Sequence, residues 1–406
     1  MMKKSIKIWL FAALALVAAG FTSCSDDDFT DSIFDTREYP LDRNSYSFPL
    51  DTFLKVTYLE PYNMKFIYRM EDIGSDMDKN LTPAHYEKSV ELAVLSKYLW
   101  YDIYTMYGGP EFLKKNSPRI IHVIGSKSYN TTQGTETLGV AEGGLKITLY
   151  NTNNLDVSNI DMMNEYFFKT MHHEFGHILD QTRLHPTAFN LLCNGQYDAS
   201  SWQDTPDSVA AGRGFMSPYA SSAYSEDWVE TLANYVTLDT LSLQRLMGAA
   251  SYEWELIDME YSDYVKRASG AASLDTVGYF KFSDSGGDDK CYRRRCARNL
   301  DDTVALDENG NVQWLHTTGR DGVAIINQKL DFVRGWLKDN WGISLNDLRQ
   351  EVQKRQFVCD ANGKPIITSR GTLINHLLQP SESNPSITVM DELCNQVYQY
   401  KSLQNK

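Results

Sequence analysis

The segment His173-Glu174-Phe175-Gly176-His177 constrains the fold of this 406-residue chain more than any other part of the sequence. An α-helix repeats every 3.6 residues, so His173 and His177 share one helix face and lie about 6 Å apart along it. Two imidazoles with this spacing can bind one zinc ion, and the Glu174 carboxylate beside the first can accept a proton from an attacking water. The sequence therefore predicts a helix that carries two zinc ligands and a general base.

The limits of this helix can be read from the sequence. Ser158 and Asp161 have the spacing of a capping box, so we expect the helix to begin there and to run to about residue 181. His172 points about 100° away from His173, which favours a packing or surface role over metal binding. Asp180 either accepts a hydrogen bond from a ligand imidazole or ends the helix face, and the sequence leaves both roles open.

A catalytic zinc site needs a third protein ligand and an open position. The metzincin pattern would place Gly at 180 and His at 183, where this chain has Asp180 and Arg183. No Glu lies about twenty residues after His177, which disfavours the thermolysin arrangement. The first Glu after the motif is Glu226, and Glu230 follows one helical turn later. One of this pair can bind zinc while the other orients a ligand; the alternative is a solvated pair on a helix surface.

Hydrophobic periodicity elsewhere predicts an α+β domain with a small mixed sheet and a helical C-terminal half. The expected strands are Asn63–Arg69, Arg119–Gly125 and Leu145–Tyr150, and the expected helices are Thr82–Tyr107, the motif helix, Ser225–Tyr235 with a helical pattern to Arg267, Val323–Asn340, Asn346–Arg355 and a short piece at Leu373–Leu378. We expect Leu145–Tyr150 to be an edge strand that binds extended peptide. No internal repeat is evident, and residues 270–320, which lose periodicity, are predicted to be an insertion.

Residues 1–23 have the features of a lipoprotein signal peptide. Three lysines precede the apolar run Ile8–Gly20, which is too short to span a bilayer, and Phe21-Thr22-Ser23-Cys24 resembles a lipobox. Cys24 is then the expected lipidation site and residues 24–54 a tether, whereas an ordinary signal peptide with an incidental cysteine is the alternative. Ser25-Asp26-Asp27-Asp28 resembles the export signal of Bacteroidetes surface lipoproteins, which predicts an outer-membrane lipoprotein exposed at the cell surface.

Composition limits the remaining classes of protein. Hydrophobic residues make up 42% of the chain and aromatic residues 12%, which predicts a folded protein. The net charge of −14 argues against nucleic acid as a partner, because phosphate binding needs a basic surface. The cysteines after Cys24 include no Cys-x-x-Cys pair, which disfavours a thiolate zinc site, and Cys291 and Cys296 form either a local disulfide or two free thiols.

Motifs outside the first helix resemble those of known metallopeptidases. The His-Glu-Phe-Gly-His segment, a tyrosine (Tyr219) seven residues before Glu226 and the Glu-x-x-x-Glu pattern are similar to the catalytic domain of anthrax lethal factor. The segments Gly214–Ala220, Ser225–Glu230 and Leu348–Val352 resemble still more closely the zinc-binding metallopeptidases of Bacteroidetes, the substrate-import-associated zinc metallohydrolase lipoproteins. The likeness covers about residues 55–356.

The resemblance implies a zincin-like metallopeptidase domain over residues 55–406, with Zn²⁺ held between two helices. By this match Glu226 is the third ligand, Glu230 orients a ligand, and the Tyr219 hydroxyl stabilises the oxyanion. Trp228-Val229 stands where the family usually has Phe-Ala, which should not affect the ligands. The resemblance also implies a peptide or glycopeptide substrate and a TonB-dependent importer as partner. Two rivals stay open: a non-catalytic accessory or substrate-binding lipoprotein of a nutrient import system, and hydrolysis of a non-peptide amide.

Overall fold

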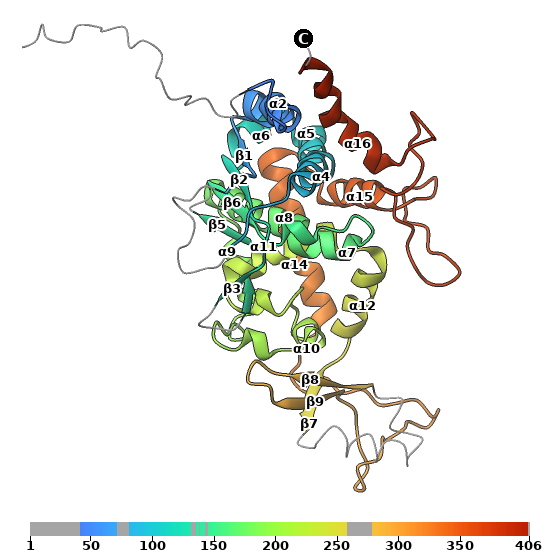
Figure 1. Cartoon of the computed structure of the whole chain (residues 1–406). Coiled ribbons are helices and arrows are strands. Elements are labelled where there is room, and N and C mark those ends of the chain that lie inside the picture. The colour runs from blue at the N-terminus through green and yellow to red at the C-terminus, as the bar shows by residue number, and fades with distance from the viewer. Residues whose placement is uncertain are drawn as a thin grey trace, which may run out of the picture. The chain divides into compact units, whose positions relative to one another are not determined.

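The computed structural model describes residues 41–70, 81–130, 135–137, 139–142, 145–257 and 278–404 (Figure 1). Arg43–Lys406 forms one unit, distinct from Met1–Asp42. The predicted signal peptide, Cys24 and the helical pattern expected between 258 and 267 lie outside the described residues. Among the helices that are described, none has both the length and the apolar character that crossing a bilayer requires.

A four-stranded mixed sheet supports the site. Strands β1 (Lys65–Ile67), β2 (Ile120–Val123) and β6 (Lys146–Leu149) are parallel, and β5 (Gly139–Glu142) pairs antiparallel with β6, in the order β1-β2-β6-β5. The predicted α+β class with a small mixed sheet is confirmed. The prediction that Leu145–Tyr150 is an edge strand is wrong, because β6 lies between β2 and β5 and the edge on that side is β5. A separate hairpin joins β3 (Ser128–Asn130) and β4 (Thr135–Thr137).

Helical structure begins earlier in the chain than the sequence predicts, and the first predicted helix begins later than expected. Residues assigned to the tether form α2 (Phe48–Leu54), a fully buried helix followed by the π turn η1 (Lys55–Leu59) and α3 (Glu60–Tyr62). The helix expected from Thr82 begins only at Tyr86, because Pro83 pairs with Ile124 at the end of β2 and the carbonyl of Thr82 accepts from the amide of Gly125. It continues without a break as α4 (Tyr86–Ser96), η2 (Lys97–Tyr101) and α5 (Asp102–Gly108), before α6 (Pro110–Asn116).

The motif helix is continuous over α7 (Ile160–Met163), the π turn η4 (Asn164–Phe168) and α8 (Lys169–Thr182). Its N-cap is Asn159, whose side chain accepts from the amide of Met162 at 3.0 Å. The predicted capping box is wrong, because the Ser158 hydroxyl donates instead to Asp156 in the preceding turn. α8 contacts β5 and β6 on one side and packs along α11 (Tyr224–Thr237) on the other, as Figure 1 shows near its centre.

Four short elements connect these two helices: α9 (Thr187–Leu192), η5 (Trp202–Asp204), α10 (Asp207–Gly212) and η6 (Tyr219–Ser221). The turn η3 (Thr152–Asn154) precedes the motif helix, and α12 (Thr240–Ala250) follows α11. The pattern expected to stay helical up to residue 267 instead turns into a strand, β7 (Trp254–Ile257). It belongs to a second sheet with β8 (Tyr279–Ser283) and β9 (Asp289–Arg294), in the order β7-β9-β8.

A repeated unit lies in two segments, 296–314 and 357–375. In the first, backbone amides of Ala297, Ala305 and Gln313 donate to the carbonyls of Gln313, Ala297 and Ala305, so three very short strands close on one another. Isolated bridges recur in the same arrangement in the second segment, with the strands spaced eight residues apart in both (296, 304, 312 and 357, 365, 373). The expectation of no internal repeat is therefore wrong. The repeat was missed because an eight-residue spacing matches neither the period of a helix nor that of a strand.

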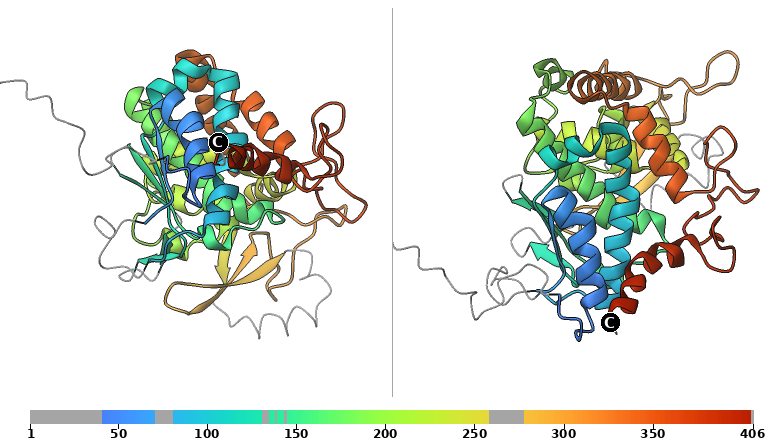
Figure 2. Two further views of the ribbon diagram at one scale, coloured as in Figure 1. Left: turned by 45° about the horizontal axis from the view of Figure 1, so that its top comes forward. Right: turned by 90° about the horizontal axis from the view of Figure 1, so that it is seen from above.

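The C-terminal half contains the predicted helices, but the second sheet and both repeated units lie in it as well. α14 (Gly322–Trp341) and α15 (Leu345–Gln356) match their predicted ranges within a residue. The helical piece expected at Leu373–Leu378 is wrong, because Leu373 lies in the second repeated unit. The last helix is α16 (Val389–Tyr398), followed by η7 (Gln399–Leu403); α16 has a Thr388–Asp391 capping box and packs on α2 and α4 (Figure 2).

The cysteine alternatives resolve in favour of free thiols. Cys291 and Cys296 are both buried and form no disulfide, and the other cysteines of the described residues are free as well. Cys296 instead packs with Val304 in a small core of the first repeated unit, against Val312 and Trp314.

Candidate metal centre

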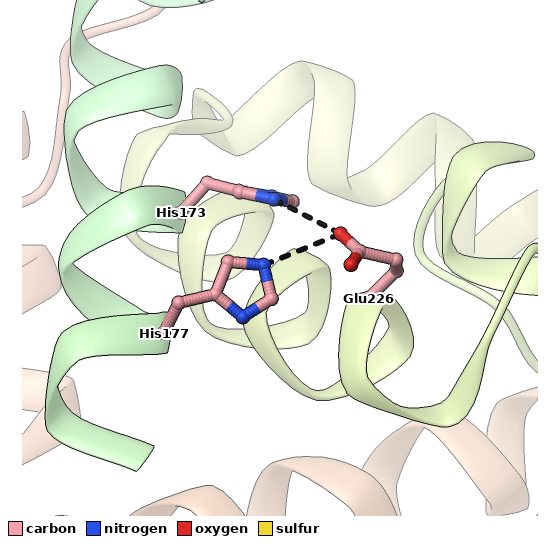
Figure 3. Close-up of side chains that lie close together, drawn as sticks. All are labelled: His173, His177 and Glu226. Atoms are coloured by element: carbon pink, nitrogen blue, oxygen red, sulfur yellow. Dashed lines mark hydrogen bonds and ion pairs between the residues drawn. The ribbon is translucent and has the colours of Figure 1, made fainter. Parts of the chain in front are cut away.

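The helices α8 and α11 bring three ligand atoms to one point (Figure 3). Glu226 Oε2 lies 3.1 Å from His173 Nε2 and 3.3 Å from His177 Nε2. All three ligand atoms lie within 4.8 Å of one another. The predicted set of His173, His177 and Glu226 is thus brought together by the fold, although 49 residues separate His177 from Glu226.

The geometry of this cluster fits a tetrahedral zinc ion. Zinc bonds to imidazole nitrogen and carboxylate oxygen are about 2.0 Å long, so tetrahedral ligand atoms are separated by roughly 3.3 Å. The two distances to Glu226 Oε2 agree with that separation. Two nitrogens and one oxygen are also the donor set of catalytic zinc sites, which leave a fourth position open. The residues present therefore fit the metal that the sequence predicts.

Close packing of the two ligand-bearing helices depends on Gly176. A Cβ added to Gly176 would lie 2.9 Å from Val229 Cγ1 and 3.2 Å from Val229 Cβ. Val229 is fully buried, so it has little room to move. The glycine between the histidines therefore lets α11 approach α8 closely enough for Glu226 to reach both imidazoles.

We expect Gly176→Ala to push α11 away from α8. Overpacking should lower the free energy of unfolding by about 1–3 kcal/mol and weaken zinc binding. Urea unfolding and zinc competition with a chelator measure the two effects. Gly248→Ala is the matched control, because a Cβ there meets nothing within 4 Å, and helix propensity should make it neutral or slightly stabilising. A Gly176→Ala protein with unchanged stability and zinc affinity would contradict the packing account.

Glu230 holds the imidazole of His173 in place. Its Oε1 lies 2.8 Å from His173 Nδ1, which leaves Nε2 facing Glu226. Its Oε2 accepts from Asn234 Nδ2 at 2.9 Å and from the Ser217 hydroxyl, and lies 2.9 Å from Lys169 Nζ. Because the side chain is only 2% exposed, these partners replace water around the charge. The predicted orienting role of Glu230 agrees with this geometry.

The carboxylates of the site have opposite electrostatic environments. Burial alone would raise the pKa of Glu226, but hydrogen bonds from His173 and His177 lower it to about 2. Burial raises the pKa of Glu174 above its usual value, opposed by the two histidines and assisted by the Glu226 and Glu230 charges. Glu226 is therefore set up as a permanently charged ligand, and Glu174 as a stronger base than an ordinary Glu.

Tyr219 lies beside the cluster, where the resemblance places it. Its ring stacks near that of His173, with centroids 5.9 Å apart and planes at 29°. Burial, followed by the charges of Glu226 and Glu230, raises the pKa of Tyr219 well above its ordinary value. The hydroxyl therefore stays protonated at neutral pH and can act as a hydrogen-bond donor.

Two residues near the motif play no part in the cluster. Asp180 accepts from the backbone amide of His185 at 2.7 Å and contacts its Nδ1 at 2.9 Å. Of the two roles left open for Asp180, the hydrogen bond with a ligand imidazole is therefore wrong, because the chain turns back after α8 and brings His185 to the carboxylate. His172 is buried with Nδ1 2.9 Å from the Tyr104 hydroxyl, and burial lowers the pKa of His172 to about 3. Its predicted packing role agrees with that environment.

The residue after the third ligand anchors α11 to α14, which the sequence did not predict. Asp227 Oδ2 lies 2.6 Å from Lys329 Nζ, and neither side chain is exposed. Tyr197 donates to the same carboxylate at 2.9 Å, and Lys329 donates to the carbonyl of Gly214 at 2.7 Å. This buried pair fixes the first turn of α11, where Glu226 lies.

Comparisons with known proteins agree with this geometry. The family model described as "Putative zinc-binding metallo-peptidase" matches residues 44–346. The chain belongs to this family. Among solved structures, a putative zinc-binding metallo-peptidase from Bacteroides caccae is 33% identical, with a TM-score of 0.53, and the match covers 76% of this chain and 91% of that one. No curated protein matches the chain. Membership in this metallopeptidase family confirms the predicted Bacteroidetes resemblance.

Proposed function

We propose that this protein is a zinc-dependent peptidase. The observation that carries the proposal is the convergence of His173 Nε2, His177 Nε2 and Glu226 Oε2, with the partly buried Glu174 next to the first ligand. A bound zinc ion would polarise the scissile carbonyl as a Lewis acid. Family membership supports both the metal and the reaction class.

The residues of the chain divide the remaining work. Glu174 accepts the proton of the attacking water and later delivers it to the leaving amine, which its raised pKa favours. The Tyr219 hydroxyl donates to the developing oxyanion, because its own raised pKa keeps the proton in place. Glu230, held by Lys169 and Asn234, keeps Nε2 of His173 directed at the metal.

The proposal includes a place and a substrate class. The lipobox at Cys24 and the acidic residues after it support a lipid-anchored protein at the cell surface. There it would act on peptides or glycopeptides taken up by a TonB-dependent importer. The rival is an accessory lipoprotein that binds substrate without cleaving it.

Metal removal tests the proposal. We expect the zinc-loaded chain to cleave members of a proteome-derived peptide library, to lose this cleavage on chelation and to regain it with zinc. Mass spectrometry of the products gives the cleaved bonds. A zinc-loaded protein that binds peptides without cleaving any of them would overturn the peptidase and favour the accessory role. A protein that cannot be loaded with zinc would also overturn the zinc-dependent peptidase.

A further inference from the structure

Trp202 lies one aromatic ring away from the metal ligands. The Trp202 and Tyr219 rings contact edge to face, with centroids 4.9 Å apart. Tyr219 in turn stacks on His173. Trp202 and Tyr219 both retain partial exposure, and Tyr219 is 36% exposed. An aromatic surface therefore continues from the reacting centre onto η5.

The position of η5 is fixed from the second sheet. Asp204, the last residue of η5, accepts from the backbone amide of Ser285 at 2.8 Å. Ser285 lies in the turn between β8 and β9, which is closed by Asp284: its Oδ1 accepts from the amides of Gly286 and Asp288. Because 81 residues separate Asp204 from Ser285, this contact joins the predicted insertion to the neighbourhood of the metal centre.

The sheet that carries this turn is itself well anchored. The rings of Phe280 on β8 and Tyr292 on β9 stack with centroids 5.7 Å apart and planes at 16°. Lys290 Nζ forms an ion pair with Asp284 at 2.8 Å. β7 contacts α10, where a Cβ on Gly212 would lie 2.5 Å from the carbonyl oxygen of Tyr252 and 3.1 Å from Trp254 Cδ1. The turn is thus held at a fixed place relative to α10, which follows η5 directly in the chain.

We propose that Trp202 is a specificity-determining residue, which contacts a large apolar side chain of an extended peptide next to the scissile bond. The Asp204–Ser285 hydrogen bond sets its position. This inference rests on the proposed peptidase function. A flat, partly exposed indole beside Tyr219 offers apolar surface where the substrate must pass, and aromatic side chains gain both from area burial and from ring contacts. The β8–β9 turn then influences substrate choice without touching the metal.

Three variants of the full-length, zinc-loaded chain test this: Trp202→Ala, Trp202→Phe and Asp204→Ala. Asp207→Ala is the matched control, an exposed aspartate just beyond η5. For wild type and each variant, kcat/KM is measured on peptide pairs that carry either Leu or Ser beside the scissile bond. We expect Trp202→Ala to reduce the preference for Leu by about tenfold or more, mainly through KM. Asp204→Ala should reduce it by a smaller factor, and Trp202→Phe and Asp207→Ala should retain most of it, with zinc content unchanged throughout.

A second measurement separates this inference from the peptidase proposal. The same peptide pairs are titrated, by fluorescence anisotropy, into Glu174→Gln protein with and without Trp202→Ala. If adding Trp202→Ala lowers the binding preference for the Leu peptide tenfold, the role of Trp202 is supported even if wild type shows no turnover. Equal binding preference in the two proteins would overturn the inference, and so would an unchanged ratio of kcat/KM values for Trp202→Ala. If wild type cleaves peptides, either result leaves the peptidase proposal standing.

Discussion

Replacing Glu174 with Gln should abolish most hydrolysis and leave the zinc in place. Gln keeps the size of the side chain but cannot accept a proton from water at neutral pH, and the loss of a general base typically lowers the rate by about 10²–10⁴-fold. The metal should stay bound because Glu174 contributes no atom to the His173, His177 and Glu226 cluster. Zinc analysis of the purified variant, together with kcat/KM on the best library peptide, measures both quantities.

Glu165→Gln provides the matched control for this experiment. Glu165 lies on the same continuous helix, in η4, and is exposed, so the same chemical change should leave the rate within about twofold. Comparable activity of the Glu174→Gln protein and wild type would show that another group acts as the base. Loss of zinc together with activity would show that Glu174 belongs to the metal site itself.

Replacing Lys329 with Met should produce the largest loss of stability. Lys329 and Asp227 are both inaccessible to solvent, with nitrogen and oxygen 2.6 Å apart. Removing one partner leaves the other charge buried without compensation, which costs about 3–5 kcal/mol. Because Asp227 directly follows Glu226 in the first turn of α11, we also expect weaker zinc binding. Urea unfolding of the zinc-loaded protein measures the first effect, and chelator competition measures the second.

Two further variants show whether the charge or the volume matters. Lys338→Met makes the same replacement at an exposed position of α14 and should change stability by less than about 0.5 kcal/mol. The double variant Lys329→Met with Asp227→Asn removes both charges and should recover part of the loss, because a neutral amide is less costly to bury. If the double variant is no more stable than Lys329→Met alone, the buried charge is not the cause.

The parts of the site that could be predicted from sequence are those set by local geometry. The spacing of His173 and His177 places both imidazoles on one helix face, and the same reasoning applies to Glu226 and Glu230. Which glutamate binds and which orients depended on resemblance, since spacing alone treats the two alike. The assignment agrees with the structure, where Glu226 approaches both Nε2 atoms and Glu230 approaches Nδ1 of His173.

Contacts between distant segments could not be predicted in this way. Even the nearby contact of Asp180 with His185 was missed, because the chain reverses after α8. Lys329 pairs with Asp227 across 102 residues, and nothing in the α14 pattern distinguishes this lysine from a surface one. The edge strand was also assigned wrongly, because β6 and β5 were not recognised as neighbours.

Signals for some of the missed elements were present in the sequence. The Thr388-x-x-Asp391 pair marks the start of α16, and Met390, Leu393 and Val397 form its buried stripe. The repeated units have turns in which the fourth residue has positive φ, at Asp302, Gly310, Gly363 and Gly371. Asn309-Gly310 and Asn362-Gly363 are recognisable turn sequences at two of these positions, but two turns far apart in the sequence do not show the eight-residue spacing.

The most direct test of the account is the zinc content of the wild type, Glu226→Ala and Glu230→Ala proteins, measured by mass spectrometry after dialysis against a moderate chelator. We predict one zinc per chain in the wild type, since His173, His177 and Glu226 form a single cluster among the described residues. Loss of an orienting group weakens metal binding by about 10–100-fold, so Glu230→Ala should retain part of its zinc. Glu226→Ala should lose nearly all of it. The reverse order of loss, or a wild-type chain that retains no zinc, would contradict the assignment of Glu226 as the third ligand.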